Sequence, residues 1–110
     1  MYINGQWLEE GPTFAVYNPA TGASIGSVID VSKEQVLQAV TAAETAFPAW
    51  SKTTACERSA ILTRCHALMM ERQRVLAELM TTEQGKPLKA AMNEVKYAAD
   101  FLLWFAEEAK

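Results

Sequence analysis

Two cysteines and a histidine are the side chains in this sequence whose chemistry could suggest a reaction centre. Cys65 and His66 are adjacent, and a nucleophilic cysteine needs a base within hydrogen-bond reach. Neighbouring side chains on a helix do not face each other, however. Cys65 also falls on an apolar stripe, so we expect a buried, unreactive thiol. Cys56 lies near the start of a predicted helix and has no partner that the sequence identifies, so we expect it to be structural or on the surface.

Other polar residues fit no known kind of site. Zinc needs three or four ligands, which one histidine and two scattered cysteines do not supply. Glu107 and Glu108 are adjacent on a helix, so their carboxylates diverge and a solvated helix end is the simpler interpretation. Gly85 and Lys86 form the Gly-Lys pair of a phosphate-binding loop, but Pro87 follows where Ser or Thr is required. These residues instead predict a break between two helices.

Length and composition exclude several classes of protein. The chain has 110 residues, half of them hydrophobic, which suits one domain or part of one. Its net charge is -3 and its basic residues are not clustered, so we expect no nucleic-acid partner. No apolar run approaches the ~20 residues of a membrane span, and the N-terminus lacks the pattern of a secretory signal. We therefore expect no membrane partner, a cytoplasmic location and two reduced thiols.

Residues 2–29 have the pattern of β-structure. Asn4 and Gly5 accept the positive φ of a type I′ turn, so residues 2–3 and 6–8 predict a hairpin. Residues 14–17 form the next predicted strand, and residues 23–29 form the last one. The turn between them contains Pro19, which lacks an amide proton, and Gly22, which tolerates left-handed backbone geometry.

Residues 32–110 have the pattern of helices. Ser32 with Gln35, and Thr54 with Glu57, form two capping boxes that predict helix starts. Pro48 predicts that the first helix ends at about Phe47. Apolar residues then recur at three- and four-residue spacing in three stretches. The predicted faces are Val36, Val40, Ala43, Phe47 and Trp50; Ile61, Leu62, Cys65, Leu68, Met69, Leu76, Leu79 and Met80; and Leu88, Ala91, Met92, Val95, Ala99, Leu102, Phe105, Ala106 and Ala109.

Breaks between these helices are also visible. The polar residues 71–74 interrupt the second face and predict a kink. Gly85 suits a helix C-terminus, and Pro87 suits the first position of the next helix. No stop signal follows the last helix, so we expect a truncated chain; alternatively Lys110 is a natural end, because a cation suits a helix C-terminus.

We therefore predict an α-rich α+β fold. An antiparallel hairpin or meander over residues 2–29 precedes three or four amphipathic helices over residues 32–110, and residues 1–110 form a single partial domain.

Several short motifs follow one another in an order that resembles a known family. They are residues 3–7 (Ile-Asn-Gly-Gln-Trp), 18–22 (Asn-Pro-Ala-Thr-Gly), 47–50 (Phe-Pro-Ala-Trp), 68–71 (Leu-Met-Met-Glu), 79–81 (Leu-Met-Thr), 83–87 (Glu-Gln-Gly-Lys-Pro), 97–99 (Tyr-Ala-Ala) and 104–108 (Trp-Phe-Ala-Glu-Glu). In this order and at this spacing, the chain resembles the N-terminal part of the aldehyde dehydrogenase superfamily. The closest resemblance is to succinate-semialdehyde dehydrogenases.

The resemblance implies what the complete protein does. Such enzymes oxidise an aldehyde to an acid with NAD or NADP, using a cysteine nucleophile, an asparagine that holds the oxyanion and a glutamate that activates water. In this family those residues come after the point that corresponds to Lys110. The resemblance thus implies an N-terminal piece of the cofactor-binding domain, from an enzyme that converts succinate semialdehyde to succinate. We assign no catalytic or cofactor-binding residue here, and we expect the chain alone to be inactive and to bind no dinucleotide. The expected partners of the complete enzyme are a small-molecule aldehyde and further copies of itself.

Two site assignments follow from the resemblance alone. Some relatives bind a monovalent cation through two backbone carbonyls and a carboxylate, which here correspond to Val16, Tyr17 and Glu83. Those relatives have Asp where this chain has Glu83, and a local cap or ion pair is the alternative for this residue. Some relatives also line the substrate entrance with the helix that holds Glu94 and Tyr97; core packing or solvent exposure is the alternative.

A hypothesis of another class remains open. The chain could be a stand-alone helical module for oligomerisation or interaction. An in-frame continuation of the gene after Lys110 would favour the fragment, and a stop codon would favour the module. A small thiol enzyme that uses Cys56 or Cys65 is the least favoured interpretation. The sequence leaves open the choice between NAD and NADP and the exact aldehyde.

Overall fold

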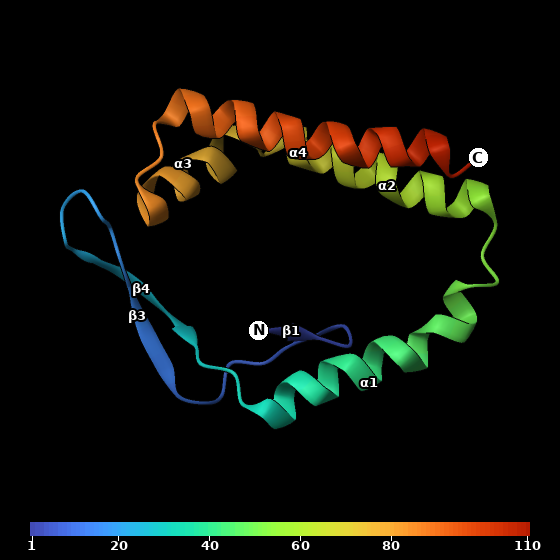
Figure 1. Ribbon diagram of the computed structural model, residues 1–110, viewed down its shortest axis with the longest axis horizontal. Coiled ribbons are helices and arrows are strands. Elements are labelled where there is room, and N and C mark those ends of the chain that lie inside the picture. The colour runs from blue at the N-terminus through green and yellow to red at the C-terminus, as the bar shows by residue number, and fades with distance from the viewer. The chain divides into compact units, whose positions relative to one another are not determined.

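A computed structural model describes all of residues 1–110, which divide into two compact units. The first unit contains Met1–Val16 and Ser24–Thr53, and the second contains Tyr17–Ala23 and Thr54–Lys110. In chain order the elements are β1 (Tyr2–Ile3), β2 (Gln6–Trp7), β3 (Thr13–Tyr17), β4 (Ser24–Ile29), α1 (Lys33–Trp50), α2 (Ala55–Glu71), α3 (Gln73–Gln84) and α4 (Leu88–Glu108) (Figure 1). The predicted α-rich α+β class is confirmed.

The first hairpin forms where Asn4 and Gly5 predicted it. Strands β1 and β2 pair antiparallel, with Tyr2 opposite Trp7. Asn4 has φ 50° and Gly5 has φ 80°, the positive values that a type I′ turn requires. The rings of Tyr2 and Trp7 lie 5.2 Å apart across the two strands, so a cross-strand aromatic pair supports the turn.

The second hairpin joins β3 to β4 through the predicted turn. The amide of Asn18 donates to the carbonyl of Ala23 at 2.9 Å, and the amide of Gly22 donates to the carbonyl of Asn18 at 2.8 Å. The side-chain oxygen of Asn18 also accepts from the amide of Ala20 at 2.8 Å. Gly22 has φ 71°, so its lack of a side chain is what allows the chain to reverse here.

Both predicted capping boxes are present. The amide of Gln35 donates to the Ser32 hydroxyl at 3.2 Å, and the Gln35 side chain accepts from the Ser32 amide at 2.9 Å. At the start of α2, the amide of Glu57 donates to the Thr54 hydroxyl at 3.2 Å, and the Glu57 carboxylate accepts from the Thr54 amide at 2.7 Å. Each box satisfies amide donors that have no partner inside the helix.

Helix α1 does not end at Phe47, so that prediction is wrong. The helix runs through Pro48 to Trp50. Pro48 lies in the last turn, where it removes one amide donor without having to support further turns. The amide of Ser51 still donates to the carbonyl of Phe47 at 2.8 Å, and this bond closes the turn around the proline.

The kink predicted at residues 71–74 is a one-residue break between α2 and α3. Arg72 has φ −99° and ψ 11°, outside helical values. Backbone hydrogen bonds still cross the break, because the Arg72 amide donates to Leu68 and the Arg72 carbonyl accepts from Leu76. The chain thus changes direction without leaving these groups unpaired.

The predicted break between two helices at Gly85 is also present, but Pro87 lies one position earlier relative to the next helix than we predicted. Gly85 is left-handed at φ 74° and its amide donates to the carbonyl of Thr81. Pro87 has ψ 132°, so it precedes the helix as its N-cap instead of being the first helical residue. Its carbonyl accepts the first helical bond, from the amide of Ala91 at 2.9 Å.

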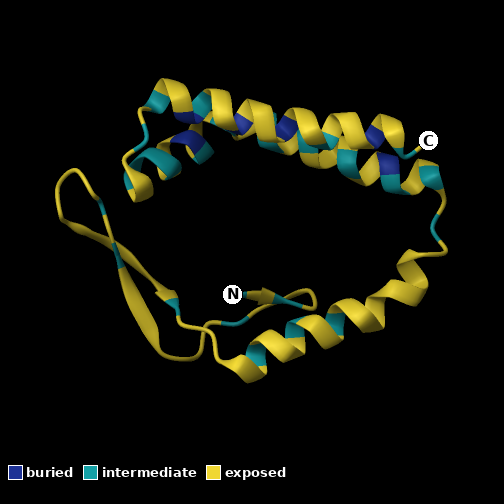
Figure 2. Cartoon of the chain, viewed as in Figure 1, coloured by how far each residue is buried: buried dark blue, intermediate teal, exposed yellow.

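The only buried residues of the chain lie in the second unit, where α2 and α3 both pack on α4 (Figures 1 and 2). They are Ser59, Ala77, Ala91, Val95, Ala99 and Ala106. Most of the predicted face of α4 is buried or half-buried, and Phe105 is the exception at 56% exposed. Five of the six buried side chains are Ser or Ala, so the helix backbones can approach one another closely.

The first unit has no buried residue. The predicted apolar face of α1 is exposed along its whole length, from Val36 at 49% to Trp50 at 45%. Helix α1 is capped and regular, but nothing in its own unit covers this face.

We predict that Gly85→Ala destabilises the second unit by about 1–3 kcal/mol, the usual cost of forcing a non-glycine residue into left-handed geometry. The new Cβ would also lie 3.0 Å from Cγ of Pro19. Gly22→Ala is the matched control, because Gly22 has a similar φ of 71° and no atom within 4 Å of the Cβ position. Urea unfolding followed by circular dichroism should show the larger loss for Gly85→Ala. An equal loss in both variants would mean that the Pro19 contact contributes nothing.

We also predict that acid weakens the start of α2. Hydrogen bonds from the Thr54 amide and the Thr54 hydroxyl lower the pKa of Glu57 below its usual value of 4.5. Because the folded-state pKa is below the unfolded value, this contribution is present above about pH 4.5 and is lost as the pH falls through the lowered pKa. Glu57→Gln keeps an acceptor but does not titrate. Thermal unfolding between pH 7 and 3 should show a larger drop in Tm for the natural chain than for Glu57→Gln. Identical acid sensitivity of the two proteins would contradict this account.

Candidate functional site

The two thiols and the histidine do not form a reaction centre. Cys56 and Cys65 are both exposed, so the prediction that Cys65 is buried is wrong. One side of α2 faces α4, as the burial of its residues shows. This side carries Ser59, Leu62, His66 and Met69. Cys65 is one position away from that line, at the edge of the apolar face. Periodicity thus located the face but misplaced its centre by about one residue.

His66 faces an acid instead of a thiol. Its Nε2 lies 4.0 Å from Oδ1 of Asp100 on α4. The other carboxylate oxygen of Asp100 accepts a hydrogen bond from Nζ of Lys96 at 2.6 Å. This cluster joins α2 to α4 and contains no nucleophile. No three His, Cys, Asp or Glu side chains in the chain are grouped closely enough to hold a metal ion.

Two of the three residues assigned to a cation site, Tyr17 and Glu83, lie in the second unit near a close contact between Pro19 and Gly85. Val16 is half-buried in β3, Tyr17 is the last residue of that strand, and Glu83 is exposed in the last turn of α3. In the second unit the ring of Pro19 packs against Gly85 so closely that a Cβ there would lie 3.0 Å from Pro19 Cγ. Tyr17 and Glu83 are each two residues from this contact. Carbonyl and carboxylate oxygens are the donors that hard cations prefer.

The two residues assigned to a substrate entrance line different hollows. Glu94 forms an ion pair with Lys86. It lines a hollow of about 360 Å³ together with Glu83 and apolar residues of α3 and α4. Tyr97 is 65% exposed and meets Phe101 edge to face, with ring centroids 4.8 Å apart. With Trp104 these rings line a smaller hollow of about 190 Å³. Thus Glu94 shares its hollow with Glu83 and not with Tyr97.

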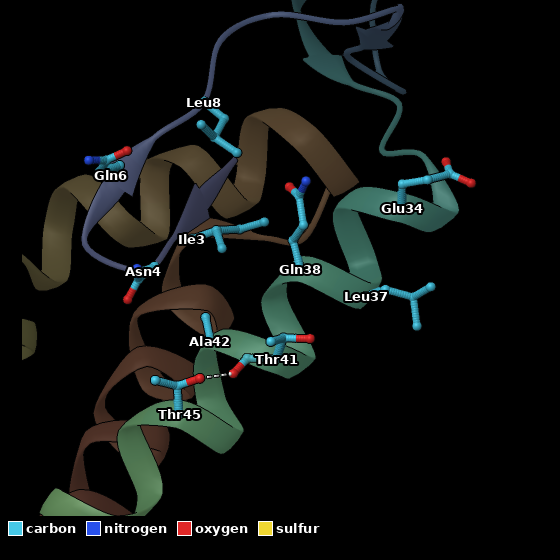
Figure 3. A pocket seen from close by; sticks show the side chains of 10 residues that line it. All are labelled: Ile3, Asn4, Gln6, Leu8, Glu34, Leu37, Gln38, Thr41, Ala42 and Thr45. Carbon is cyan, nitrogen blue, oxygen red and sulfur yellow. Dashed lines mark hydrogen bonds between the residues drawn. The ribbon is translucent and has the colours of Figure 1, made fainter.

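Sequence reasoning missed a groove of about 640 Å³, which lies between the β1–β2 hairpin and α1 (Figure 3). Ile3 and Leu8 of the hairpin segment and Gln38 of α1 point into it. Glu34 is its one ionisable lining residue. Hydrogen bonds from its own amide and from the Ser32 hydroxyl lower the pKa of this carboxyl. The groove therefore has no acid–base pair or nucleophile. No motif in the sequence points to this groove, because it depends on how the hairpin and α1 pack against each other.

The geometry as a whole provides surfaces and no reacting groups. The thiols are solvent-exposed, and the single histidine pairs with a carboxylate. None of the four helices has the length and apolar character needed to cross a membrane.

Comparison with known proteins shows which family the chain is similar to. The family model described as "Aldehyde dehydrogenase family" matches residues 7–110. A glutarate-semialdehyde dehydrogenase of Pseudomonas putida is 55% identical over 99% of this chain, which covers 23% of that protein. An NADP-dependent succinate-semialdehyde dehydrogenase of Escherichia coli is 50% identical over 98% of this chain, again 23% of that protein.

Solved structures agree with the sequence relatives. The structure of a succinate-semialdehyde dehydrogenase from Burkholderia pseudomallei superimposes with a TM-score of 0.92 and 44% identity. The match covers 97% of this chain and 23% of that one. The chain thus spans about a quarter of the length of the relatives that it matches. With a family match over residues 7–110, the chain belongs to the aldehyde dehydrogenase family.

Proposed function

We propose that this chain is the N-terminal part of an NAD(P)-dependent aldehyde dehydrogenase that oxidises succinate semialdehyde to succinate. One observation carries the proposal. Almost the full length of the chain is similar to about a quarter of the length of each of two semialdehyde dehydrogenases, at 55% and 50% identity. A third relative, at 46% identity, is a 3-sulfolactaldehyde dehydrogenase of Pseudomonas putida. All three named substrates are short aldehydes with an anionic group, so this is the substrate class that we infer.

The chain by itself would then have a structural role. It has no nucleophile beside a base, and we propose that it is inactive and binds no dinucleotide without the rest of the enzyme. We propose that residues 1–110 form one partial domain that the rest of the polypeptide completes. The complete enzyme would be a cytoplasmic homo-oligomer.

The exposed apolar residues also favour a second candidate, a helical interaction module. Phe47, Trp104 and Phe105 are 56–64% exposed. A module that acts alone would use such residues to bind a partner or another copy. The two candidates differ in a measurable way, because only the enzyme part supports turnover when the rest of an enzyme is joined to it.

A fusion tests the main proposal. Residues 1–110 would replace the matching region of the Escherichia coli succinate-semialdehyde dehydrogenase, to which they are 50% identical. We expect the fusion to form NADPH, followed at 340 nm, with a kcat/KM within about tenfold of the intact enzyme, a difference of about 1.4 kcal/mol. The unfused chain should form none. A folded fusion without turnover would contradict the proposal and favour the module.

The same fusion tests the entrance residues. We propose that Glu94 and Tyr97 line the path of the substrate. Tyr97→Ala should then raise KM with little change in kcat, whereas Lys89→Ala, at an exposed position on the same helix, should change neither. An unchanged KM in Tyr97→Ala would show that the residue has no part in the entrance.

We also propose that the carbonyls of Val16 and Tyr17 and the carboxylate of Glu83 bind a monovalent cation. The support is the Pro19–Gly85 contact, which Tyr17 and Glu83 flank. The Tm of the chain should be higher in KCl or NaCl than in tetramethylammonium chloride at equal ionic strength, because the larger ion cannot enter. Glu83→Gln should abolish this difference, and Glu78→Gln on the same helix should preserve it. A difference that persists in Glu83→Gln would exclude Glu83 as a ligand.

A further inference from the structure

Lys86 lies in the short link between α3 and α4, and its side chain forms an ion pair with Glu94 of α4. The backbone on both sides of the lysine is restricted. Gly85 before it is left-handed at φ 74°, and the ring of Pro87 after it fixes φ at −54°. The lysine side chain is 33% exposed and that of Glu94 is 44% exposed, so the pair is partly shielded from water.

Glu94 also lines the hollow of about 360 Å³ that α3 and α4 form in the second unit. Its ionisable lining residues are Glu83 and Glu94, and both are acids. The other lining side chains are apolar, apart from Gln84, so they supply no positive charge. Lys86 does not line the hollow, and it can change the charge there only through the carboxylate with which it pairs.

Two acids beside a substrate path conflict with the substrate class of the proposed function. The relatives are named for glutarate semialdehyde, succinate semialdehyde and 3-sulfolactaldehyde, each of which has an anionic group. Like charges a few ångströms apart repel each other in water, and they do so more strongly near a protein surface. An unpaired Glu94 on the proposed path would therefore disfavour the molecules that the enzyme has to admit.

We propose that Lys86 sets the charge preference of the substrate path by neutralising the carboxylate of Glu94, so that anionic aldehydes can pass. The lysine contacts neither the substrate nor a reacting atom, and it is a positioning residue that acts through Glu94. The proposal rests on the proposed function, which supplies the anionic substrate and places Glu94 on its path. Glu83, the other acid of the hollow, is the carboxylate of the proposed cation site, so a bound cation would offset its charge.

The alternative is that the ion pair only fastens the link to α4. Ion pairs as exposed as this one contribute little to stability, which favours a role in charge over a role in folding. The two roles predict different results when the acid is removed. If the pair is a fastener, loss of either partner has the same effect. If the lysine neutralises an acid on the path, loss of Glu94 makes Lys86 unnecessary.

The test measures KM for succinate semialdehyde in the fusion described above. Lys86→Met should raise KM about fivefold with little change in kcat, because Glu94 then meets the substrate unpaired. Glu94→Gln alone should not raise KM, and the variant with both changes should return to within about twofold of the natural fusion. Lys86→Arg keeps the cation and should keep the low KM. Lys89→Met is the matched control, because it removes the same charge from an exposed lysine that is in none of the ion pairs of the chain.

Four results would overturn the role of Lys86 while leaving the proposed function intact, since the natural fusion is active in each. They are an unchanged KM in Lys86→Met, an equal rise in Glu94→Gln, a double variant that stays at the KM of Lys86→Met, and an equal rise in Lys89→Met. A Lys86→Met fusion that does not fold, judged by circular dichroism, would show that the pair is a fastener and would also overturn it. A folded natural fusion without turnover contradicts the proposed function itself, and the role of Lys86 falls with it.

Discussion

Close packing of small side chains against α4 is the interaction on which the second unit depends. Ala91, Ala99 and Ala106 are fully buried, and Ser59 of α2 is 2% exposed. No large side chain is fully buried anywhere in the chain. Half-buried larger side chains, such as Met69 and Leu76, pack against the core that contains Ala91. Cohesion therefore comes from many contacts between pairs of atoms, each worth only about 0.1–0.2 kcal/mol. A larger side chain in place of these alanines would force the helices apart and remove many of those contacts together.

The same constraint explains why so much apolar surface faces outward. Small residues occupy most of the inside of the helix pair, and several large ones, such as Trp104 and Phe105, lie on its flanks at 64% and 56% exposure. A self-sufficient domain of this size needs its large apolar residues inside to offset the entropy of folding. Under the proposed function, the rest of the enzyme would cover those flanks. The chain spans about a quarter of the length of the relatives that it matches.

Local features could be predicted from the sequence because they depend on a few adjacent residues. The turn at Asn4, the capping box at Thr54 and the left-handed Gly85 each follow from one backbone dihedral or one hydrogen bond. Burial could not be predicted in the same way. Periodicity identifies the apolar face of a helix but not whether another element covers it. Cys65 and the apolar face of α1 are both exposed for this reason, although each was expected to be part of an apolar face. The hairpin groove was missed for a similar reason, because it depends on how two elements pack and not on either of them alone.

The charges near the end of α3 bear on the cation-site proposal. Lys86 is paired with Glu94, so its ammonium group is not free to neutralise the nearby Glu83. Glu83 is in none of the ion pairs of the chain, and it lies two residues before Gly85, which contacts the ring of Pro19. A paired lysine next to an unpaired acid is the arrangement that favours a bound cation, since an intramolecular ammonium would otherwise compete for the same oxygen atoms. Under the cation-site proposal, the extra methylene of Glu relative to Asp gives the carboxylate of Glu83 a longer reach than an Asp would have at the same position.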